Sequence, residues 1–352
     1  MSNRKIIFIS TKQYGYLTAF YYYSLYLNDC QIEFICIDRH LPKYDSPENV
    51  HVQYCNRRLF SLKVIRYLWT DECRKKKPII IVNYYKLCGL IGLCNMTQST
   101  VLDIRSGEIS RSGVRVFLLN ALIWVESLFY KRLFIISENL RLRLKLSLRK
   151  AKLIPLGAIE IGYSDKSFKE LNLLYVGTFF NREIHLTVRG LAKFKEQHPE
   201  IPIKYTIIGF GPTSETELIL REIKSKEILE GIVDLYGRLN HRELKEHFKK
   251  SNIGVSFVPQ TDYFHCQPPT KTFEYICSGL VCIATATNEN KQIIDRSNGV
   301  IISDTPESFA NGLEIIWANR NSYNSQAIKT NSFKYHWSEI VENHLRPALK
   351  NT

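Results

Sequence analysis

Paired cysteines and long apolar runs are both missing from the 352-residue sequence. None of the nine cysteines forms a CxxC pair, and several lie inside apolar runs such as FICID and GLVCIAT. This distribution is typical of reduced, buried thiols, and no Cys and His group has zinc-ligand spacing. The longest apolar run, Val116–Tyr130, contains Glu126 and is too short to span a bilayer. Because no signal peptide is recognisable after Met1 either, we expect a cytoplasmic protein.

Acidic residues are scarce in the first half of the chain. Residues 1–158 contain 25 Lys and Arg against 11 Asp and Glu, whereas the remainder contains 23 of each, so the whole net charge of +14 lies in the first half. A basic half beside a neutral half predicts that one domain faces something anionic. Nucleic acid and an anionic membrane surface are the two alternatives.

Short β-branched runs alternate with helix-length segments along the chain, which is typical of an α/β fold with parallel sheets. Two successive sets of about six runs predict two doubly wound, Rossmann-like domains, divided near residues 158–167. The first set is KIIFIS, QIEFICID, PIIIVNY, STVLDIR, RLFIIS and AKLIPLG; the second is LNLLYVGTF, IKYTIIGFG, GIVDLYG, NIGVSFVP, LVCIATAT and NGVIIS.

The segment NLRLRLKLSLRKAK is ambiguous, because it alternates apolar and basic residues with the period of a strand. Ser137 can nevertheless cap a helix that begins at Glu138, and a parallel sheet needs a helical crossover here. We therefore predict a helix.

The stretch QPPTKTFEYICSG, residues 267–279, has the pattern of a short helix opened by proline and ended by Gly279. The free N–H groups of its first turn, with Lys271 beside them, predict an anion site. Glu274 lies one turn beyond Thr270 and has no obvious structural partner. Taken alone, Lys271 is equally consistent with an ordinary solvated lysine at a helix start. Glu274 is equally consistent with a carboxylate that only interacts favourably with the helix dipole.

Other strand-end loops carry glycine and a cation near the start of a helix, where open α/β sheets bind ligands. A single loop of this kind is ordinary turn chemistry, but several at corresponding strand ends indicate a phosphate site. In the second half these loops contain Gly177, Thr178 and Arg182; Gly209; and Gly237 and Arg238. In the first half they contain Gly15, and Asp103 with Arg105.

Five motifs in order, LLYVGTF, YTIIGFGP, VDLYGRLNHREL, IGVSFVP and PTKTFEYICSGLVCIAT, resemble the C-terminal half of glycosyltransferase family 4. The resemblance covers residues 152–344 and is weaker before them, through VLDIRSG, FIIS and IPLG. It implies a GT-B architecture, with an acceptor-binding domain (1–158) and a nucleotide-sugar-binding domain (159–330) facing a cleft. It also implies a final helix (331–352) that returns to the first domain.

The resemblance implies roles for individual residues on the donor side. Lys271 and Arg182 match the basic pair that binds the donor's diphosphate, and Glu274 matches a ribose-binding glutamate. The family's other glutamate in this E-x7-E element is replaced here by Cys266. Gly237 and Arg238 match the loop against the base, and the donor set is completed by Gly177, Thr178, Gly209 and Thr270.

On the acceptor side, the resemblance implies contributions from Gly15, Asp103 and Arg105, with Asp103 joining Lys271 and Arg182 in the catalytic set. Only Gly15 remains of the Gly-Gly loop that the family often has. Fixed cations stabilise a diphosphate leaving group, and the sequence has no DxD-like element, so neither metal nor cofactor is expected. Retention implies front-face attack by the acceptor hydroxyl, with a UDP-sugar favoured over a GDP-sugar.

The resemblance also implies a lipid-linked acceptor, since members of the family commonly glycosylate such acceptors at the cytoplasmic face of the membrane. Together with the basic half, it leads us to expect a peripheral protein at the inner face of the cytoplasmic membrane, acting on a polyprenyl-diphosphate-linked saccharide in cell-surface polysaccharide synthesis. Residues 111–152 combine Trp124, Phe129 and Tyr130 with many Lys and Arg, which suits anionic lipid. The alternative is that the aromatic residues are core and the basic ones merely solvated.

Three other functions stay open at this point. Another GT-B enzyme, such as a nucleotide-sugar epimerase or an inverting transferase, would share these motifs. A nucleic-acid-binding protein would use the basic half, although no RNP-like, zinc-finger or KH-type motif is present. A degenerate, non-catalytic relative would explain Cys266.

Overall fold

The computed structural model describes residues 4–350 apart from residues 97, 110 and 111; Arg111, at the start of the predicted basic segment, therefore lies outside the described residues. Contacts divide the chain into two compact units. The first unit consists of two segments, the chain up to Leu156 and the chain from Trp337 onward, and the second unit is Gly157–His336. Each unit is a parallel-sheet α/β structure, which confirms the predicted pair of Rossmann-like domains.

Within the described residues, the first unit contains a seven-stranded parallel sheet in the order β3-β2-β1-β4-β5-β6-β7. The sequence-based set lacked β3, because VHVQYC places His51 and Gln53 in a half-exposed edge strand and has no continuous apolar run. The strands are β1 (Lys5–Ser10), β2 (Gln31–Ile37), β3 (Val50–Cys55), β4 (Ile79–Asn83), β5 (Ser99–Ile104), β6 (Arg132–Ile135) and β7 (Ala151–Leu153).

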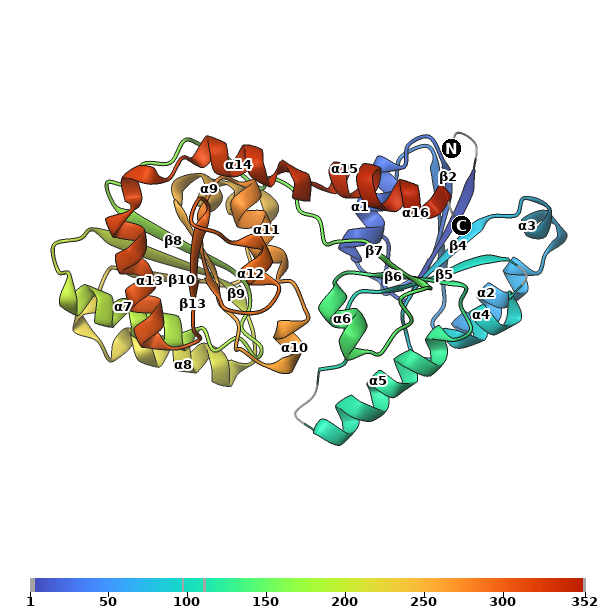
Figure 1. Cartoon of the computed structure of the whole chain (residues 1–352), viewed down its shortest axis with the longest axis horizontal. Helices are drawn as coiled ribbons and strands as arrows, with labels where there is room; N and C mark the ends of the chain where they lie inside the picture. Colours follow the sequence, from blue (N-terminus) through green and yellow to red (C-terminus); the bar gives the residue numbers. More distant parts are fainter. Residues whose placement is uncertain (1–3, 97, 110–111, 351–352) are drawn as a thin grey trace. The chain divides into compact units, whose positions relative to one another are not determined.

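Helices cover both faces of this sheet, with α1 on one face and α2, α4 and α5 on the other (Figure 1). The ambiguous basic segment forms the predicted helix only as far as Arg143, and residues 144–150 are turn and loop. The Ser137 hydroxyl caps this helix by accepting from the Leu140 N–H at 3.1 Å. The helices are α1 (Thr18–Tyr26), α2 (Phe60–Leu68), α3 (Asp71–Lys75), α4 (Gly89–Cys94), α5 (Gly113–Ser127) and α6 (Glu138–Arg143).

The end of the chain packs on α1 of the first unit. The Trp337 ring stacks on Tyr22 with 5.5 Å between centroids, and Arg346 pairs with Asp29 at 2.7 Å. This terminal helix consists of α15 (Trp337–Ile340), a π-helical turn (Val341–Leu345) and α16 (Arg346–Lys350).

The second unit contains a six-stranded parallel sheet in the order β10-β9-β8-β11-β12-β13, and all six strands correspond to predicted runs. The strand order reverses between β8 and β11, which is where ligands bind in doubly wound sheets. The strands are β8 (Leu171–Thr178), β9 (Ile203–Phe210), β10 (Val233–Tyr236), β11 (Ile253–Ser256), β12 (Val281–Thr285) and β13 (Gly299–Ile302).

Helices α7 and α13 pack together on one face of the second sheet, and α11 and α14 pack together on the other (Figure 1). No helix among the described residues is long and apolar enough to cross a membrane. The helices are α7 (His185–Gln197), α8 (Thr213–Lys224), α9 (His241–Lys250), α10 (Asp262–His265), α11 (Thr270–Cys277), α12 (Asn290–Ile293), α13 (Pro306–Ala318) and α14 (Ser325–Ser332). Short 3-10 turns occupy Glu227–Leu229, Arg320–Ser322 and Phe333–Tyr335.

Candidate functional site

Helix α11 follows β11 at the switch point and has the predicted ends. Pro269 is its N-cap residue, and Gly279 follows the C-cap with a φ of +75°. A side chain at Gly279 would be strained by this φ and would place its Cβ 2.9 Å from the Ser325 carbonyl oxygen. The predicted proline start and glycine end are therefore confirmed.

A buried hydrogen-bond chain fixes the start of α11 to the ends of β11 and β12. The Thr272 hydroxyl lies 2.7 Å from the Ser256 hydroxyl and donates to Asn290 Oδ1 at 2.9 Å. Asn290 Nδ2 in turn donates to the Thr285 carbonyl at 2.9 Å. The four side chains are fully buried. This chain holds the first turn of α11 in place against the sheet.

Lys271 points from α11 toward the end of β8. Its Nζ lies 4.5 Å from the centroid of the Tyr175 ring and 3.4 Å from the Tyr175 hydroxyl. Gly177 makes room for it, because a Cβ there would lie 2.8 Å from Lys271 Cε and closer still to Nζ. Burial, together with the positive charge of Arg182, lowers the pKa of Lys271 to about 7.

Arg182 reaches the same region from the loop between β8 and α7. Its guanidinium carbon lies 4.5 Å from the centroid of the Phe264 ring, and burial lowers its pKa. The loop has left-handed backbone at Asn181 and Glu183, on both sides of Arg182. Glu215 of α8 fixes this loop by accepting the Asn181 N–H at 3.1 Å.

Neither cation forms a direct ion pair among the described residues, although Glu274 and Glu215 act on Lys271 and Arg182 from a greater distance. No carboxylate of this part of the chain lies within ion-pair distance of Lys271 or Arg182. Aromatic rings, which are weak partners for a cation, occupy the positions where a carboxylate would neutralise them. Burial lowers the pKa of both cations, and the charge of Arg182 lowers the pKa of Lys271 further, so an anion bound between them would stabilise their charged forms.

Glu274 and Thr270 lie one turn apart on α11. Glu274 is half-buried, and burial raises its pKa while Lys271 acts in the opposite direction. Its carboxylate makes no hydrogen bond to the described part of the chain, as the sequence suggested. Thr270 is exposed at the first helical position. Both side chains are available to a ligand at the start of α11.

The remaining predicted donor residues lie at the ends of β8, β9 and β10. Gly209 pairs with Gly177 across β8 and β9, and a Cβ at Gly209 would lie 2.8 Å from the Phe179 ring. The Thr178 carbonyl accepts from the Tyr175 hydroxyl at 2.6 Å. Thus Gly177, Thr178 and Gly209 form the backbone beneath Lys271.

Arg238 stacks on an exposed ring at the end of β9. Its guanidinium carbon lies 4.4 Å from the centroid of Phe210, and both side chains are exposed. Gly237, just before it, has open space where a side chain would be. The pair presents a flat cationic and aromatic surface of the kind on which a planar ring can stack.

Asp103 and Arg105 lie in the first unit, at the end of β5. Arg105 Nε donates to the fully buried Asp103 carboxylate at 2.8 Å, and its other nitrogens donate to the Tyr23 hydroxyl and the Ile154 carbonyl. Burial raises the pKa of Asp103 against the opposing charge of Arg105. These contacts are those of a structural ion pair, and a catalytic role for Asp103 stays a prediction.

Gly15 ends the first strand-end loop of this unit with a φ of +87°. A Cβ there would lie 2.6 Å from Cγ of the Tyr44 ring and closer still to Cδ2, so only glycine lets this exposed ring cover the loop. The buried Gln13 side chain ties the same loop to the one after β2, donating to the Leu41 carbonyl at 2.8 Å.

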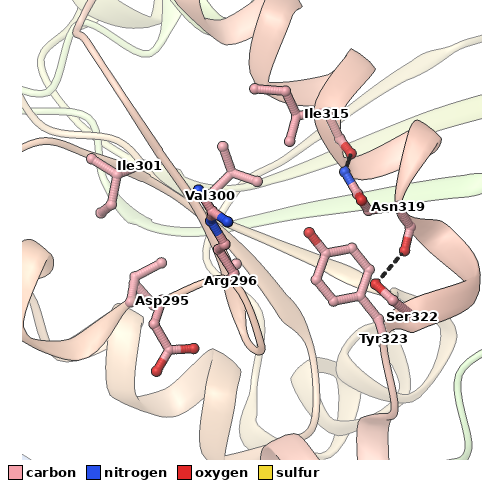
Figure 2. Close-up of a pocket in the computed structure, with 10 residues that line it drawn as sticks. Asp295, Arg296, Val300, Ile301, Ile315, Asn319, Ser322 and Tyr323 are labelled. Carbon is pink, nitrogen blue, oxygen red and sulfur yellow. Dashed lines mark hydrogen bonds between the residues drawn. The ribbon is translucent and has the colours of Figure 1, made fainter.

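A cavity of about 690 Å³ lies beside the edge strand β13 and contains none of the predicted site residues. Figure 2 shows Ser322 hydrogen-bonded to Asn319, and Asn319 also donates to the Ile315 carbonyl. The cavity is also lined by the charged side chains of Asp295 and Arg296, but none of its lining residues belongs to the predicted donor or acceptor set.

Sequence reasoning missed the residues that hold the two cations in place. Tyr175 had a usable signal, because it precedes Gly177 by two residues and therefore lies on the same face of β8. Phe264 and Glu215 belong to other helices, and nothing in the sequence connects them to Arg182. Among the described residues, no cluster of three His, Cys, Asp or Glu side chains suits a metal ion.

Comparison with known proteins gives one family match and several structures with the same fold. Residues 170–319, which contain every predicted donor-side residue, match the family model described as "Glycosyl transferases group 1". A search of curated protein sequences finds no match.

Solved structures with the same fold cover nearly the whole chain. Sucrose-phosphate synthase from Thermosynechococcus elongatus has a TM-score of 0.74 at 15% identity, covering 99% of this chain and 98% of its own. HepE from Anabaena, in complex with UDP, has a TM-score of 0.73 at 9% identity, covering 99% and 100%. The lipopolysaccharide outer core galactosyltransferase WaaB has a TM-score of 0.67 at 13% identity, covering 98% and 99%. The chain therefore has the GT-B glycosyltransferase fold.

Proposed function

We propose that the chain transfers a sugar from a nucleotide-sugar, UDP-linked rather than GDP-linked, to a saccharide acceptor with retention of configuration. The observation that carries the proposal is the pair Lys271 and Arg182, which lies at the switch point with no carboxylate partner among the described residues. A diphosphate supplies the negative charge that this pair lacks. The family match over residues 170–319 and the UDP bound to HepE support the same donor class.

The donor nucleotide fits the other groups of the site. The Glu274 carboxylate can accept hydrogen bonds from ribose hydroxyls, since it makes none to the described residues. The base would stack near Phe210 and Arg238, which present a flat surface at the end of β9. The diphosphate would then lie beside Lys271 and Arg182 at the end of β8, where Gly177 leaves room for the lysine side chain.

In the transfer step, the bond between the sugar's anomeric carbon and the phosphate oxygen breaks, and the nucleoside diphosphate leaves. The acceptor hydroxyl oxygen bonds to the anomeric carbon on the same face, and its proton passes to the departing phosphate oxygen. Lys271 and Arg182 stabilise the charge that develops on the diphosphate. They supply the positive charge for this step, so the proposal requires no metal ion or cofactor.

The acceptor is proposed to be a polyprenyl-diphosphate-linked saccharide used in cytoplasmic synthesis of a cell-surface polysaccharide. The basic first half of the chain supports an acceptor with a negatively charged carrier. Gly15, Asp103 and Arg105 lie at the carboxyl ends of β1 and β5, where the first unit would meet a ligand.

A second candidate function is nucleotide binding without transfer, which Cys266 favours because it stands where the resembling family has a glutamate. An epimerase or an inverting transferase would also retain the diphosphate site. These alternatives differ in what they make from the donor: nothing, an epimer, or a product of opposite anomeric configuration.

The test is a thermal-shift and calorimetry panel of UDP, GDP, ADP and CMP without added metal, followed by incubation of the preferred nucleotide's sugars with polyprenyl-diphosphate saccharides. We expect one nucleotide to bind and its sugar to appear in a product with retained configuration, as read by NMR. Binding without any product would favour the non-catalytic alternative. An inverted or epimerised product would favour the other enzymes, and no nucleotide binding would contradict the proposal.

A further inference from the structure

Helix α5 exposes a broad apolar stripe and buries polar side chains, unlike an ordinary surface helix. Its buried residues are Ile123, Glu126 and Ser127, two of which are polar. Much of its apolar surface nevertheless points outward, with exposed fractions of 70% for Phe117 and 60% for Leu118, while Val116, Leu119 and Leu122 are half-buried. A surface helix normally buries its apolar stripe and exposes its polar one. We call the outward stripe the outer α5 face; it consists of Val114, Phe117, Leu118, Trp124, Val125 and Leu128.

The inward polar contacts of α5 are satisfied, so this orientation is specified by the sequence. Glu126 accepts the Leu87 N–H at 2.6 Å, and the Ser127 hydroxyl donates to the Trp124 carbonyl at 2.6 Å. Gly89 of α4 packs against Glu126, because a Cβ there would lie 3.1 Å from its Cγ. Rotating α5 to bury its apolar stripe would break these contacts. The outer face therefore belongs to the folded state and is available to something outside the unit.

The spacing on the outer α5 face is that of a continuous stripe. Val114, Leu118, Val125 and Leu128 follow intervals of three, four and seven residues, which place side chains on one side of a helix. The first turns of α5 extend away from the rest of the first unit (Figure 1). Leu90 and Leu93 of the adjacent helix α4 are also exposed and extend the apolar surface. A contiguous surface of this kind marks an interaction site.

The charges around the outer α5 face favour an anionic bilayer over a second copy of the chain. Helices α4 and α5 contain one carboxylate between them, Glu126, and it is buried, while Arg115 and Lys131 at the two ends of α5 are exposed. Residues 112–153 contain nine Lys and Arg against two Asp and Glu. A second copy of the chain would bring like charges together around this face, whereas anionic lipid headgroups neutralise them.

We propose that the outer α5 face inserts into the headgroup region of an anionic membrane with α5 lying parallel to the surface. The helix has 15 residues, about 22 Å in length at about 1.5 Å per residue, which is too short to span a bilayer. An interfacial helix buries its apolar face at the boundary between headgroups and acyl chains while basic residues contact phosphates. Trp124, 43% exposed, has the amphipathic ring that is enriched at this depth.

The experiment is flotation of the full chain with vesicles of phosphatidylcholine alone or of phosphatidylcholine mixed with phosphatidylglycerol. The wild type is expected to float with the anionic vesicles only, and its tryptophan emission is expected to shift to the blue. The variant Phe117→Gln/Leu118→Gln/Trp124→Gln removes three exposed apolar side chains and should lower vesicle affinity by more than about tenfold. The matched control is Leu218→Gln/Leu220→Gln on α8, whose exposed leucines lie in the other unit.

The outcomes separate this inference from the proposed function. Thermal unfolding and nucleotide binding of the triple variant should match the wild type, because its changes lie on an exposed face of the first unit. Failure of the wild type to float with anionic vesicles would overturn the inference and leave the nucleotide site untouched. Equal flotation of wild type and triple variant would also overturn it. So would sedimentation that shows a dimer which the triple variant abolishes, because the occupant would then be a second copy.

Discussion

The Lys271 ammonium occupies the space that a side chain on Gly177 would fill. A Cβ on Gly177 would lie 2.8 Å from Lys271 Cε and closer still to Nζ. Because Gly177 of β8 has no side chain, the Lys271 ammonium of α11 can lie against the Tyr175 ring. The proposed diphosphate site depends on this fit between a strand end and the start of a helix.

The variant Gly177→Ala is expected to weaken UDP binding by about tenfold or more, because the new methyl group displaces Lys271 from the position above β8. Calorimetry of UDP binding measures the effect. Gly237→Ala is the matched control, since its Cβ would meet no atom within 4 Å. If both variants bind UDP like the wild type, the position of Lys271 does not matter to the site.

Nucleotide binding should be coupled to proton uptake. In the free protein the Lys271 pKa is lowered to about 7, and a bound diphosphate favours the charged form, which raises it again. Above pH 7 the lysine must therefore take up a proton when UDP binds, and affinity should fall as pH rises. Calorimetry at pH 8 in buffers of different ionisation enthalpy measures the uptake. An uptake equal in wild type and Lys271→Met would assign the proton to another group.

The same pKa predicts how the ligand-free protein's stability responds to pH. The folded pKa lies below the unfolded value of about 10.4, so the unfolded chain binds more protons between the two values. Lys271 therefore lowers stability, most fully below pH 7, and this penalty is relieved as pH rises toward 10.4. Lys271→Met should raise the unfolding temperature at pH 7 relative to wild type. A lower unfolding temperature would mean that the lysine has a stabilising partner.

Glu215 should act through the loop that carries Arg182. The Glu215 carboxylate accepts the Asn181 N–H, and Glu215→Ala removes this hydrogen bond. We expect UDP affinity to fall by about tenfold, which is roughly the effect of losing one hydrogen bond to a charged group. Glu215→Gln keeps an acceptor and should restore most of the affinity. Glu217→Ala, exposed on the same helix, is the control. Equal loss in the Gln and Ala variants would show that the carboxylate charge, and not the loop contact, matters.

Asp103 should affect the stability of the first unit. Asp103→Asn leaves the Arg105 guanidinium without its buried counter-ion, which is expected to cost about 3–5 kcal/mol of unfolding free energy in urea titrations. UDP binding, which involves residues of the second unit, should be unchanged. Asp45→Asn, exposed in the same unit, is the control. Loss of transfer activity without loss of stability would instead support a catalytic Asp103.

The sequence predicted the features that depend on local chemistry. The proline start and glycine end of α11, the Ser137 cap and the glycine at the end of β8 follow from backbone preferences, which neighbouring residues reveal. The edge strand β3 was missed because polar residues alternate within it. An element could therefore be predicted where its own residues determine its backbone, and it was missed where they do not.

Contacts between distant elements could not be predicted in this way. Phe264 beneath Arg182 and Glu215 beside Asn181 come from helices far along the chain. The aromatic residues of the basic segment were also indistinguishable by sequence, yet Trp124 is exposed and Tyr130 is buried. The orientation of α5 runs against the usual rule for apolar stripes, because Glu126 is held inside by Leu87 and Cys88.

The most direct test of the central claim compares UDP with uridine by calorimetry, in EDTA, on wild type and Lys271→Met. If Lys271 and Arg182 hold the diphosphate, wild type binds UDP far more tightly than uridine, and Lys271→Met loses about 100-fold in UDP affinity while uridine binding is unchanged. If wild type binds both ligands equally, or if the variant binds UDP as wild type does, the two cations do not form a diphosphate site.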